Sequence, residues 1–303
     1  MKAKIFIDGR EGTTGLQIYD RLANRDDIEL LLIDEEKRKD VSARKQLLNE
    51  ADLVFLCLPD DAAKESVSLI TNERTKVIDA STAHRTNPAW VYGLAELSAE
   101  QRRKIAKAKR VANPGCHSTG FITAVYPLLS AGIMQNDYPL TCFSLTGYSG
   151  GGKSMIRSYK EDKTPEMFSP RLYALELSHK HLPEMMYVTG LKRAPVFCPV
   201  VDDYYCGIAL TISIHNDLLS GNQTAEDILK HLKSYYKDEK YVEVSPELGK
   251  GTLESNWGAG EDNLRLTVSG NEKLTIITAQ FDNLGKGAAG AAVQNMEIML
   301  EEK

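Results

Sequence analysis

The sequence predicts an α/β protein: a Rossmann-like, doubly wound parallel sheet, joined to an α+β substrate domain with a largely antiparallel sheet. In the first third of the chain, short apolar runs alternate with helix-like stretches, as in βαβ units. A glycine-rich loop follows the first apolar run, the usual place for such a loop in a doubly wound sheet. After residue 140, strand-like runs follow one another with few helices between them, which favours antiparallel pairing.

The elements of the first domain follow from composition and length. Branched apolar runs bounded by turn formers predict buried parallel strands at 3–8, 28–34, 52–58 and 76–80. Longer stretches between and after them predict helices at 15–25, 41–50, 61–72 and 97–109. A short strand at 109–112 then leads into Asn113-Pro114-Gly115.

The second domain has a different rhythm. Strands are expected at 140–147, 185–191, 194–201, 206–215 and within 263–281. Helices are expected at 223–237 and in the Ala-rich tail 284–302, which can return to the first domain. We therefore predict a dinucleotide-binding domain of residues 1–113 plus about 284–303, and a catalytic, substrate-binding and oligomerisation domain of residues 114–283. Two domains also suit 303 residues, at about 150 per domain.

Composition argues against several classes of protein. The chain has 37 Lys and Arg against 42 Asp and Glu, a net charge of −5, which disfavours nucleic-acid binding through a basic patch. No apolar run approaches the roughly 18 residues of a membrane span, and no signal-peptide core is recognisable. Five cysteines cannot all pair in disulfides. We expect a cytoplasmic protein that binds neither nucleic acid nor membrane.

The loop 9–15 (GREGTTG) is a candidate site for the phosphates of a dinucleotide. Its spacing differs from GxGxxG, but it lies between the first strand and the first helix, where helix N–H groups attract anions. Glycines that serve only a tight turn are the alternative. The candidate contacts are Gly9, Arg10, Gly12, Thr13, Thr14 and Gly15.

The choice between NAD and NADP stays open from the residues alone. Asp34 ends the second predicted strand, where a carboxylate would bind a ribose 2′-hydroxyl and favour NAD. Arg10, Lys37 and Arg38 could instead gather around a 2′-phosphate, which the arginine fork binds in a bidentate manner. Lys37 and Arg38 also fit an ordinary solvated turn.

Cys116 is the candidate nucleophile. It lies in NPGCHSTG, directly before an apolar helical run, and the positive end of a helix dipole stabilises a thiolate. Cys57, Cys142 and Cys198 lie inside apolar runs and are expected to be inert packing residues, whereas Cys206 is not assigned by the sequence.

A nucleophilic cysteine needs an acid–base partner, and His179 or His181 in SHKHLPE is the best candidate. The same HxH pair fits a metal site, but no further ligands stand at zinc spacing, so we expect no metal. The loop GYSGGGK, which contains Ser149, Gly150 and Lys153, is a candidate anion nest. Arg85, after the strand at 76–80, is a further candidate for binding an anionic substrate.

Together these motifs resemble the short form of the N-acetyl-γ-glutamyl-phosphate reductase family, among the aspartate-semialdehyde dehydrogenase-like acyl-phosphate reductases. The resemblance runs nearly from end to end. Its motifs are GREGTTG, DASTAHR, NPGCHSTG, GYSGGGK, HKHLPEM and NLGKGAAGAAVQNM. The first loop departs from the alanine-rich versions of longer relatives, which leaves contacts by Arg10 and Glu11 open.

The resemblance implies an NADP-dependent reduction of N-acetyl-glutamyl 5-phosphate to N-acetyl-glutamate 5-semialdehyde in arginine biosynthesis, with release of inorganic phosphate. It implies Cys116 as the nucleophile that forms a thioester and one of His179 and His181 as the acid–base. It further implies a homo-oligomer, either a dimer or a tetramer. The remaining residues that it implies are Gly285 and Gly287 for the cofactor, and Arg85, Ser149, Gly150, Lys153 and Glu184 for the substrate.

Three other functions remain to be separated from this one. An aspartate-semialdehyde dehydrogenase-type enzyme would use the same thiol on another acyl phosphate. A non-catalytic redox sensor would bind the nucleotide without turnover. A cysteine hydrolase would leave the nucleotide loop without a purpose.

Overall fold

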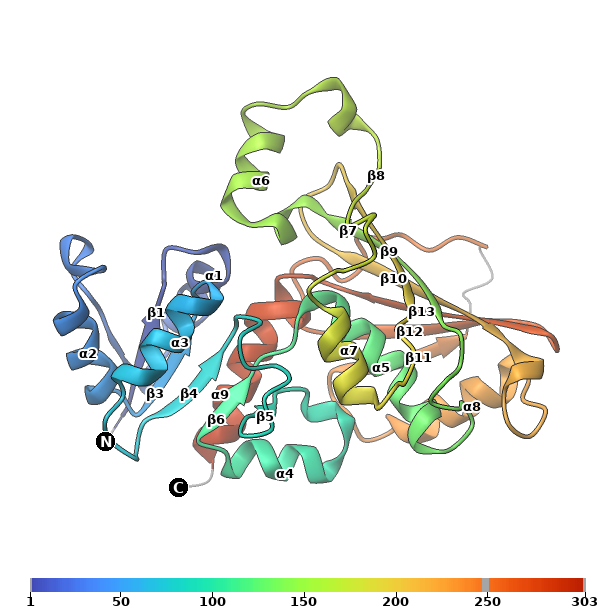
Figure 1. The fold of residues 1–303 in the computed structure, drawn as a ribbon, viewed down its shortest axis with the longest axis horizontal. Coiled ribbons are helices and arrows are strands. Elements are labelled where there is room, and N and C mark those ends of the chain that lie inside the picture. The colour runs from blue at the N-terminus through green and yellow to red at the C-terminus, as the bar shows by residue number, and fades with distance from the viewer. Residues whose placement is uncertain (1, 247–250, 302–303) are drawn as a thin grey trace. The chain divides into compact units, whose positions relative to one another are not determined.

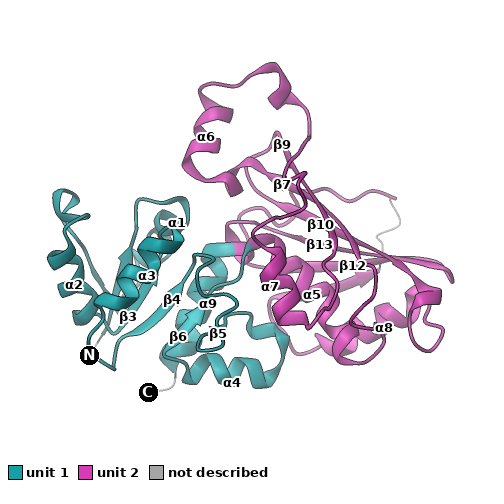
Figure 2. Cartoon of the chain, in the orientation of Figure 1, with its two compact units in different colours: residues 1–115, 288–303 teal, residues 116–287 magenta. Residues whose placement is uncertain are grey.

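The computed structural model describes residues 2–246 and 251–301, so the tail helix is followed as far as Glu301. The chain forms two compact units (Figure 2). Unit 1 comprises Met1–Gly115 and Ala288–Lys303, and unit 2 comprises Cys116–Gly287. The predicted domain boundaries lie two to four residues from those of the units.

Unit 1 is built on a six-stranded sheet in which every pairing is parallel, in the order β2-β1-β3-β4-β6-β5. The strands are β1 (Ala3–Asp8), β2 (Ile28–Leu31), β3 (Leu53–Leu56), β4 (Lys76–Asp79), β5 (Val91–Tyr92) and β6 (Arg110–Ala112). The strand order reverses at β1, because β2 and β3 lie on its opposite sides. Ligands bind outside the carboxyl ends of the strands at such a switch point. The predicted doubly wound sheet is confirmed.

Helices cover both faces of this sheet (Figure 1). They are α1 (Thr13–Leu22), α2 (Val41–Glu50), α3 (Asp60–Leu69), α4 (Ala99–Lys107) and α9 (Gly290–Glu301). Helices α1, α4 and α9 share one core, with Ile18, Ile105 and Met296 fully buried. Helices α2 and α3 close the other core through Leu48 and Ala63. The final helix is therefore part of the first unit.

Buried amides in α9 join the two segments of unit 1. Asn295 donates to the backbone carbonyl of Gly93 and to Oδ1 of Asn113, and Gln294 donates to Glu96. Because buried polar groups need hydrogen-bond partners, these bonds fix the position of α9 together with its hydrophobic contacts.

Unit 2 is built on a seven-stranded mixed sheet in the order β11-β12-β13-β10-β7-β9-β8. Its strands are β7 (Thr141–Gly147), β8 (Arg171–Leu172), β9 (Val196–Asp202), β10 (Ile208–His215), β11 (Val242–Pro246), β12 (Leu264–Gly270) and β13 (Leu274–Phe281). Four pairings are antiparallel, and the pairs β7–β9 and β11–β12 are parallel. The expected α+β domain with a largely antiparallel sheet is confirmed.

One face of this sheet is covered by helices, with α5 and α8 packed on the strands and α7 on α5. The helices of unit 2 are α5 (Cys116–Ser130), α6 (Gly152–Lys160), α7 (Leu182–Thr189) and α8 (Ala225–Tyr235). Pro127 lies inside α5 and has no N–H to donate to the carbonyl of Thr123. The hydroxyl of Tyr236 donates to that carbonyl instead, at 2.7 Å.

The predicted strand at 185–191 is wrong, because these residues belong mainly to α7. Val188 and Thr189 favour a strand locally, but Leu182, Met185 and Thr189 are buried at helical spacing. Pro183 stands in the first turn, and Gly190 ends the helix in the left-handed conformation, with φ of 74°. Helix α6 and three short strands, β5, β8 and β11, were not predicted from the sequence.

Within the described part of the chain, no helix has the length and apolar character needed to cross a membrane.

Candidate active site

The glycine loop of unit 1 turns sharply between β1 and α1. Gly9 has φ of +87°, and a Cβ atom on it would collide with the carbonyl of Cys57, so only glycine fits where this loop meets the end of β3. The N–H of Gly12 donates to the carbonyl of Gly9, and α1 begins at the next residue, Thr13. The hydroxyl of Thr13 is shielded from solvent and has no hydrogen-bond partner among the described residues. The predicted contacts Thr14 and Gly15 lie in the same first turn.

A cavity of about 330 Å³ opens beside this loop, and cations line much of it. Its basic residues are Arg10, Arg38, Lys39 and Arg44, which stand beside Glu11 and Glu35. Arg44 is buried, and its guanidinium donates to Asp8 and Ser66 within the unit. The cavity therefore has one buried cation and three more cations nearer the surface. Arg10 pairs with Glu11 at 3.4 Å, and Arg38 pairs with Glu35 at 3.5 Å.

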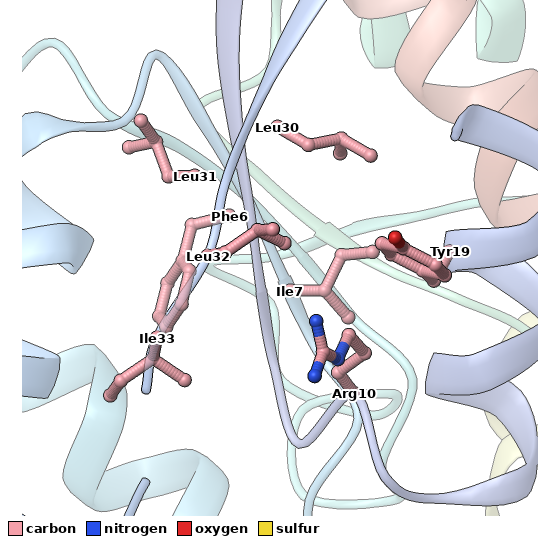
Figure 3. A pocket seen from close by; sticks show the side chains of 8 residues that line it. All are labelled: Phe6, Ile7, Arg10, Tyr19, Leu30, Leu31, Leu32 and Ile33. Atoms are coloured by element: carbon pink, nitrogen blue, oxygen red, sulfur yellow. The ribbon is translucent and has the colours of Figure 1, made fainter. Parts of the chain in front are cut away.

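The residues considered for the choice between NAD and NADP lie in two different places. Arg10 and Arg38 line the cavity, whereas Asp34 and Lys37 pair with each other at an exposed turn, 3.2 Å apart. Lys39 and Arg44, which the sequence analysis missed, also line it. The guanidinium of Arg10 lies 5.2 Å from the centroid of the Tyr19 ring, in a small apolar hollow lined by β1, α1 and residues 30–33 (Figure 3).

In unit 2, Cys116 is the first residue of α5, as the sequence suggested. A Cβ atom on Gly287 would lie 2.9 Å from Cβ of Cys116, so the bare backbone of this glycine packs against the cysteine. Gly285 and Gly287 belong to a π-helical turn that precedes α9, Gly285–Ala289. This turn supports Cys116 directly, a role that the sequence analysis did not anticipate.

Three of the other four cysteines have surroundings that disfavour a thiolate. Burial raises the pKa of Cys57 and of Cys142 far above the ordinary thiol range. Burial and the carboxylate of Asp282 raise the pKa of Cys206 to about 12. Cys198 lies half-buried in β9. With their raised pKa values, Cys57, Cys142 and Cys206 do not readily form a thiolate at neutral pH.

Three histidines gather in unit 2, and two of them contact the ring of Phe197. The ring centroids of His179 and His181 lie 4.7 Å apart, and each lies 5.6 Å from that of His117. His117 and His179 both contact Phe197, at 5.2 and 5.1 Å. Burial, followed by the charge of Lys180, lowers the pKa of His179 to about 4, so its imidazole is neutral at pH 7.

The two candidate acid–base histidines have different bonds. The backbone N–H of His181 donates to Nδ1 of His179 at 3.1 Å, so the proton of neutral His179 is on Nε2. His179 is therefore arranged as a hydrogen-bond donor. His181 is buried, and its Nε2 lies 4.0 Å from Oε1 of the buried Glu184, which can stabilise a positive charge on the ring.

His117 has two partners of its own. Its Nδ1 lies 2.9 Å from Oγ of Ser144 on β7, and its Nε2 lies 2.9 Å from the hydroxyl of Tyr173. Burial, followed by the charge of His179, lowers the pKa of His117 to about 3. Neither Ser144 nor Tyr173 was predicted from the sequence, because no local motif marks them.

The predicted anion-binding residues are held in different ways. Ser149 is buried in a short 3₁₀ turn, where its hydroxyl accepts from Asn283 at 2.9 Å and its N–H donates to Tyr205. Gly150 and Lys153 are exposed, and Lys153 lies in the first turn of α6.

Arg85 is buried in unit 1, where it donates to the backbone carbonyls of Asn113 and Ala80. These two bonds tie the residue to the ends of β6 and β4. Among residues 2–246 and 251–301, no group of three or more His, Cys, Asp or Glu side chains is placed to hold a metal ion.

Comparisons with known proteins agree with this division of the chain. The semialdehyde dehydrogenase NAD-binding domain family matches residues 4–105, and the semialdehyde dehydrogenase dimerisation domain family matches residues 116–283. The chain is 45% identical to N-acetyl-γ-glutamyl-phosphate reductase 2 of Pseudomonas putida, over 98% of this chain and 96% of the relative. It is 47% identical to N-acetyl-γ-glutamyl-phosphate reductase of Sinorhizobium medicae, over 99% of both chains.

Solved structures share the fold at low sequence identity. Aspartate semialdehyde dehydrogenase II of Vibrio cholerae superposes with a TM-score of 0.77 at 14% identity, covering 100% of this chain and 99% of that one. Aspartate semialdehyde dehydrogenase of Candida albicans, solved with NADP, gives a TM-score of 0.67 at 14% identity, covering 99% and 98%.

Proposed function

Because the chain belongs to the N-acetyl-γ-glutamyl-phosphate reductases of the semialdehyde dehydrogenase family, we propose that it reduces N-acetyl-L-glutamyl 5-phosphate to N-acetyl-L-glutamate 5-semialdehyde. The reaction releases inorganic phosphate and is a step of arginine biosynthesis. The observation that carries the proposal is Cys116 at the start of α5, in the same unit as a cluster of three histidines. In our proposal, unit 2 holds the acyl group and unit 1 holds the nicotinamide cofactor.

The chemistry starts at Cys116. Its thiolate attacks the carbonyl carbon of the acyl phosphate, the C–O bond to the phosphate breaks, and a thioester forms. His181 takes the thiol proton at the start and returns it to the sulfur when the aldehyde leaves. Glu184 stabilises the protonated ring in the interval, since its carboxylate lies 4.0 Å from Nε2. His179 acts as a hydrogen-bond donor through Nε2–H, because its Nδ1 already accepts a hydrogen bond from the backbone N–H of His181.

We propose NADP as the cofactor, bound by the glycine loop and the basic cavity. The fit is supported by the close approach of Gly9 to Cys57, the unpartnered hydroxyl of Thr13, and the cations of the cavity. Arg38 and Lys39 would face a 2′-phosphate, and the first turn of α1 would face the pyrophosphate. When bound, the reduced cofactor supplies the hydride that converts the thioester into the aldehyde. No metal takes part in this scheme.

We propose that Arg85, Ser149, Gly150, Lys153 and Glu184 form the substrate site, either by direct contact or by supporting the groups that make contact. The exposed Lys153 and the glycines before it suit a phosphate that enters and leaves. The buried Arg85 and Ser149 suit a role in fixing the loops around the substrate. Arg85 hydrogen-bonds to the carbonyl of Asn113, and Ser149 to the side chain of Asn283.

We also propose that the chain works as a homo-oligomer, a dimer or a tetramer, in the cytoplasm. The face of the unit 2 sheet opposite its helices exposes Phe143, Val196 and Ile276, each at least 41% accessible. The register places these side chains of β7, β9 and β13 on the same face of the sheet. An apolar sheet face of this kind is a natural contact surface for a second copy. The variant Phe143→Asp should yield monomers in sedimentation velocity, and an unchanged assembly would exclude this face.

The activity is tested by nicotinamide absorbance in the reverse direction, with N-acetyl-glutamate semialdehyde, phosphate and NADP⁺. Phosphate-dependent reduction of NADP⁺ is expected from the wild type, with Cys116→Ala as the inactive control. Aspartate semialdehyde in place of the acetylated substrate tests the related dehydrogenase activity. Nucleotide binding without turnover on either substrate would favour the redox sensor and overturn the proposal.

A further inference from the structure

His117 adjoins the nucleophile in sequence, yet it is not built as an acid–base. It is buried between the hydroxyls of Ser144 and Tyr173, each 2.9 Å from one of its ring nitrogens. Because its pKa lies at about 3, the ring is neutral throughout the physiological range. A neutral imidazole donates from one nitrogen and accepts at the other, so the three groups form a chain of hydrogen bonds with a direction.

The burial of Ser144 decides that direction. Within residues 2–246 and 251–301, its fully buried hydroxyl hydrogen-bonds to His117 alone. If the serine donates to Nδ1, then Nε2–H of His117 donates to the oxygen of Tyr173, and every buried donor has an acceptor. In the reverse direction the serine hydrogen would be buried without an acceptor, which is strongly unfavourable. The chain therefore runs from Ser144 through His117 to Tyr173.

This direction leaves the O–H of Tyr173 available as a donor. The tyrosine is only half-buried, follows the edge strand β8, and has its ring centroid 5.9 Å from that of His179. Burial, followed by the charge of Cys116, raises the pKa of Tyr173 well above its ordinary value, so the phenol stays protonated near the cysteine. A protonated phenol with a fixed oxygen suits a developing negative charge.

We propose that the hydroxyl of Tyr173 donates a hydrogen bond to the carbonyl oxygen of the acyl group that Cys116 attacks, with His117 and Ser144 as positioning residues. The proposal rests on the proposed function. Tyr173 transfers no proton: it stabilises the oxyanion that forms when the thiolate adds to the carbonyl and again when hydride is added. The tyrosine thus complements His179, the other neutral donor of the site.

The first test is Tyr173→Phe, with Tyr187→Phe on the exposed side of α7 as the matched control. Loss of one oxyanion donor is expected to lower kcat about 100-fold. The change in KM should be small, and the pH–rate profile should keep its shape, because an acid–base would shift it. A kcat within twofold of the wild type would overturn the inference. An inactive wild type would instead contradict the proposed function.

The second test does not depend on turnover. In the full-length protein labelled with ¹⁵N-histidine, His117 is expected to carry its proton on Nε2, and His117→Gln identifies its signals. A proton on Nδ1 would overturn the inference, whether or not Tyr173→Phe folds. Ser144→Ala removes the donor to Nδ1, so we expect the Nδ1–H form to appear and kcat to fall severalfold. An unchanged tautomer together with an unchanged kcat would exclude Ser144 as a positioning residue.

Discussion

Acidification should destabilise unit 2 through His117. The pKa of this ring is about 3 in the folded protein and about 6.5 in the unfolded chain. Below pH 6.5 the unfolded chain therefore binds a proton that the folded protein does not, and the free energy of unfolding falls with pH. The contribution is complete above pH 6.5 and is lost progressively as the pH falls toward 3.

The size of the effect follows from the width of this window. Each unit of pKa difference that the pH crosses is worth about 1.36 kcal/mol. Because pH 6.5 is the midpoint of the unfolded-state titration, the wild type should lose about 2 kcal/mol through His117 between pH 6.5 and 4.5. A variant without the ring should lack this part of the pH dependence, although it is less stable than the wild type at neutral pH.

The assay is urea unfolding at pH 6.5 and 4.5 of the wild type and of His117→Gln. Both carry Trp90→Phe, so that Trp257, the remaining tryptophan, reports on unit 2. The stability gap between the two proteins should shrink by about 2 kcal/mol on acidification. His215→Gln, at an exposed strand end, controls for the loss of a histidine. A gap that does not change with pH would refute the buried, neutral state of His117.

Three further predictions concern other parts of the molecule. Gly287→Ala should displace Cys116, because the new Cβ would lie 2.9 Å from Cβ of Cys116. We expect at least a tenfold loss of kcat in the steady-state assay. Full activity would contradict the close packing of Gly287 against Cys116. Arg38→Gln should reduce the preference for NADP over NAD about tenfold, measured as a ratio of kcat/KM, because one charged hydrogen bond to the 2′-phosphate is lost. Tyr236→Phe should leave the carbonyl of Thr123 without its hydrogen bond and lower the free energy of unfolding by about 1–3 kcal/mol, measured by urea unfolding. An unchanged midpoint of the urea transition would show that water replaces the hydroxyl.

Features that depend on neighbouring residues could be predicted from the sequence. The alternation of strands and helices in unit 1, the glycine loop after β1 and the position of Cys116 at the start of a helix are all local patterns. The wrong strand prediction at 185–191 also has a local cause. Pro183 and Gly190 mark the start and end of a helix, but the β-branched residues between them were given more weight.

Arrangements that depend on tertiary packing could not be predicted in the same way. Ser144 and Tyr173 meet His117 only because β7 and the end of β8 are placed by the sheet register. Arg44 reaches the basic cavity of unit 1 from α2, because its partner Asp8 stands at the end of β1. In both cases the residues are more than 25 positions apart, and the distance in sequence hides the contact.

The return of α9 to unit 1 has a consequence for how the chain folds during synthesis. Helix α9 supplies Met296 and Met299 to the same core as Ile18 and Ile105, yet it follows all of unit 2. At about 5–20 residues per second, a ribosome needs about 10 to 35 s to make residues 116–287. During that time the first 115 residues have one sheet face without its last helix. The N-terminal part of this protein therefore depends on the completion of its C-terminal part, and a nascent chain is most exposed to misfolding, or to chaperone binding, at that apolar face.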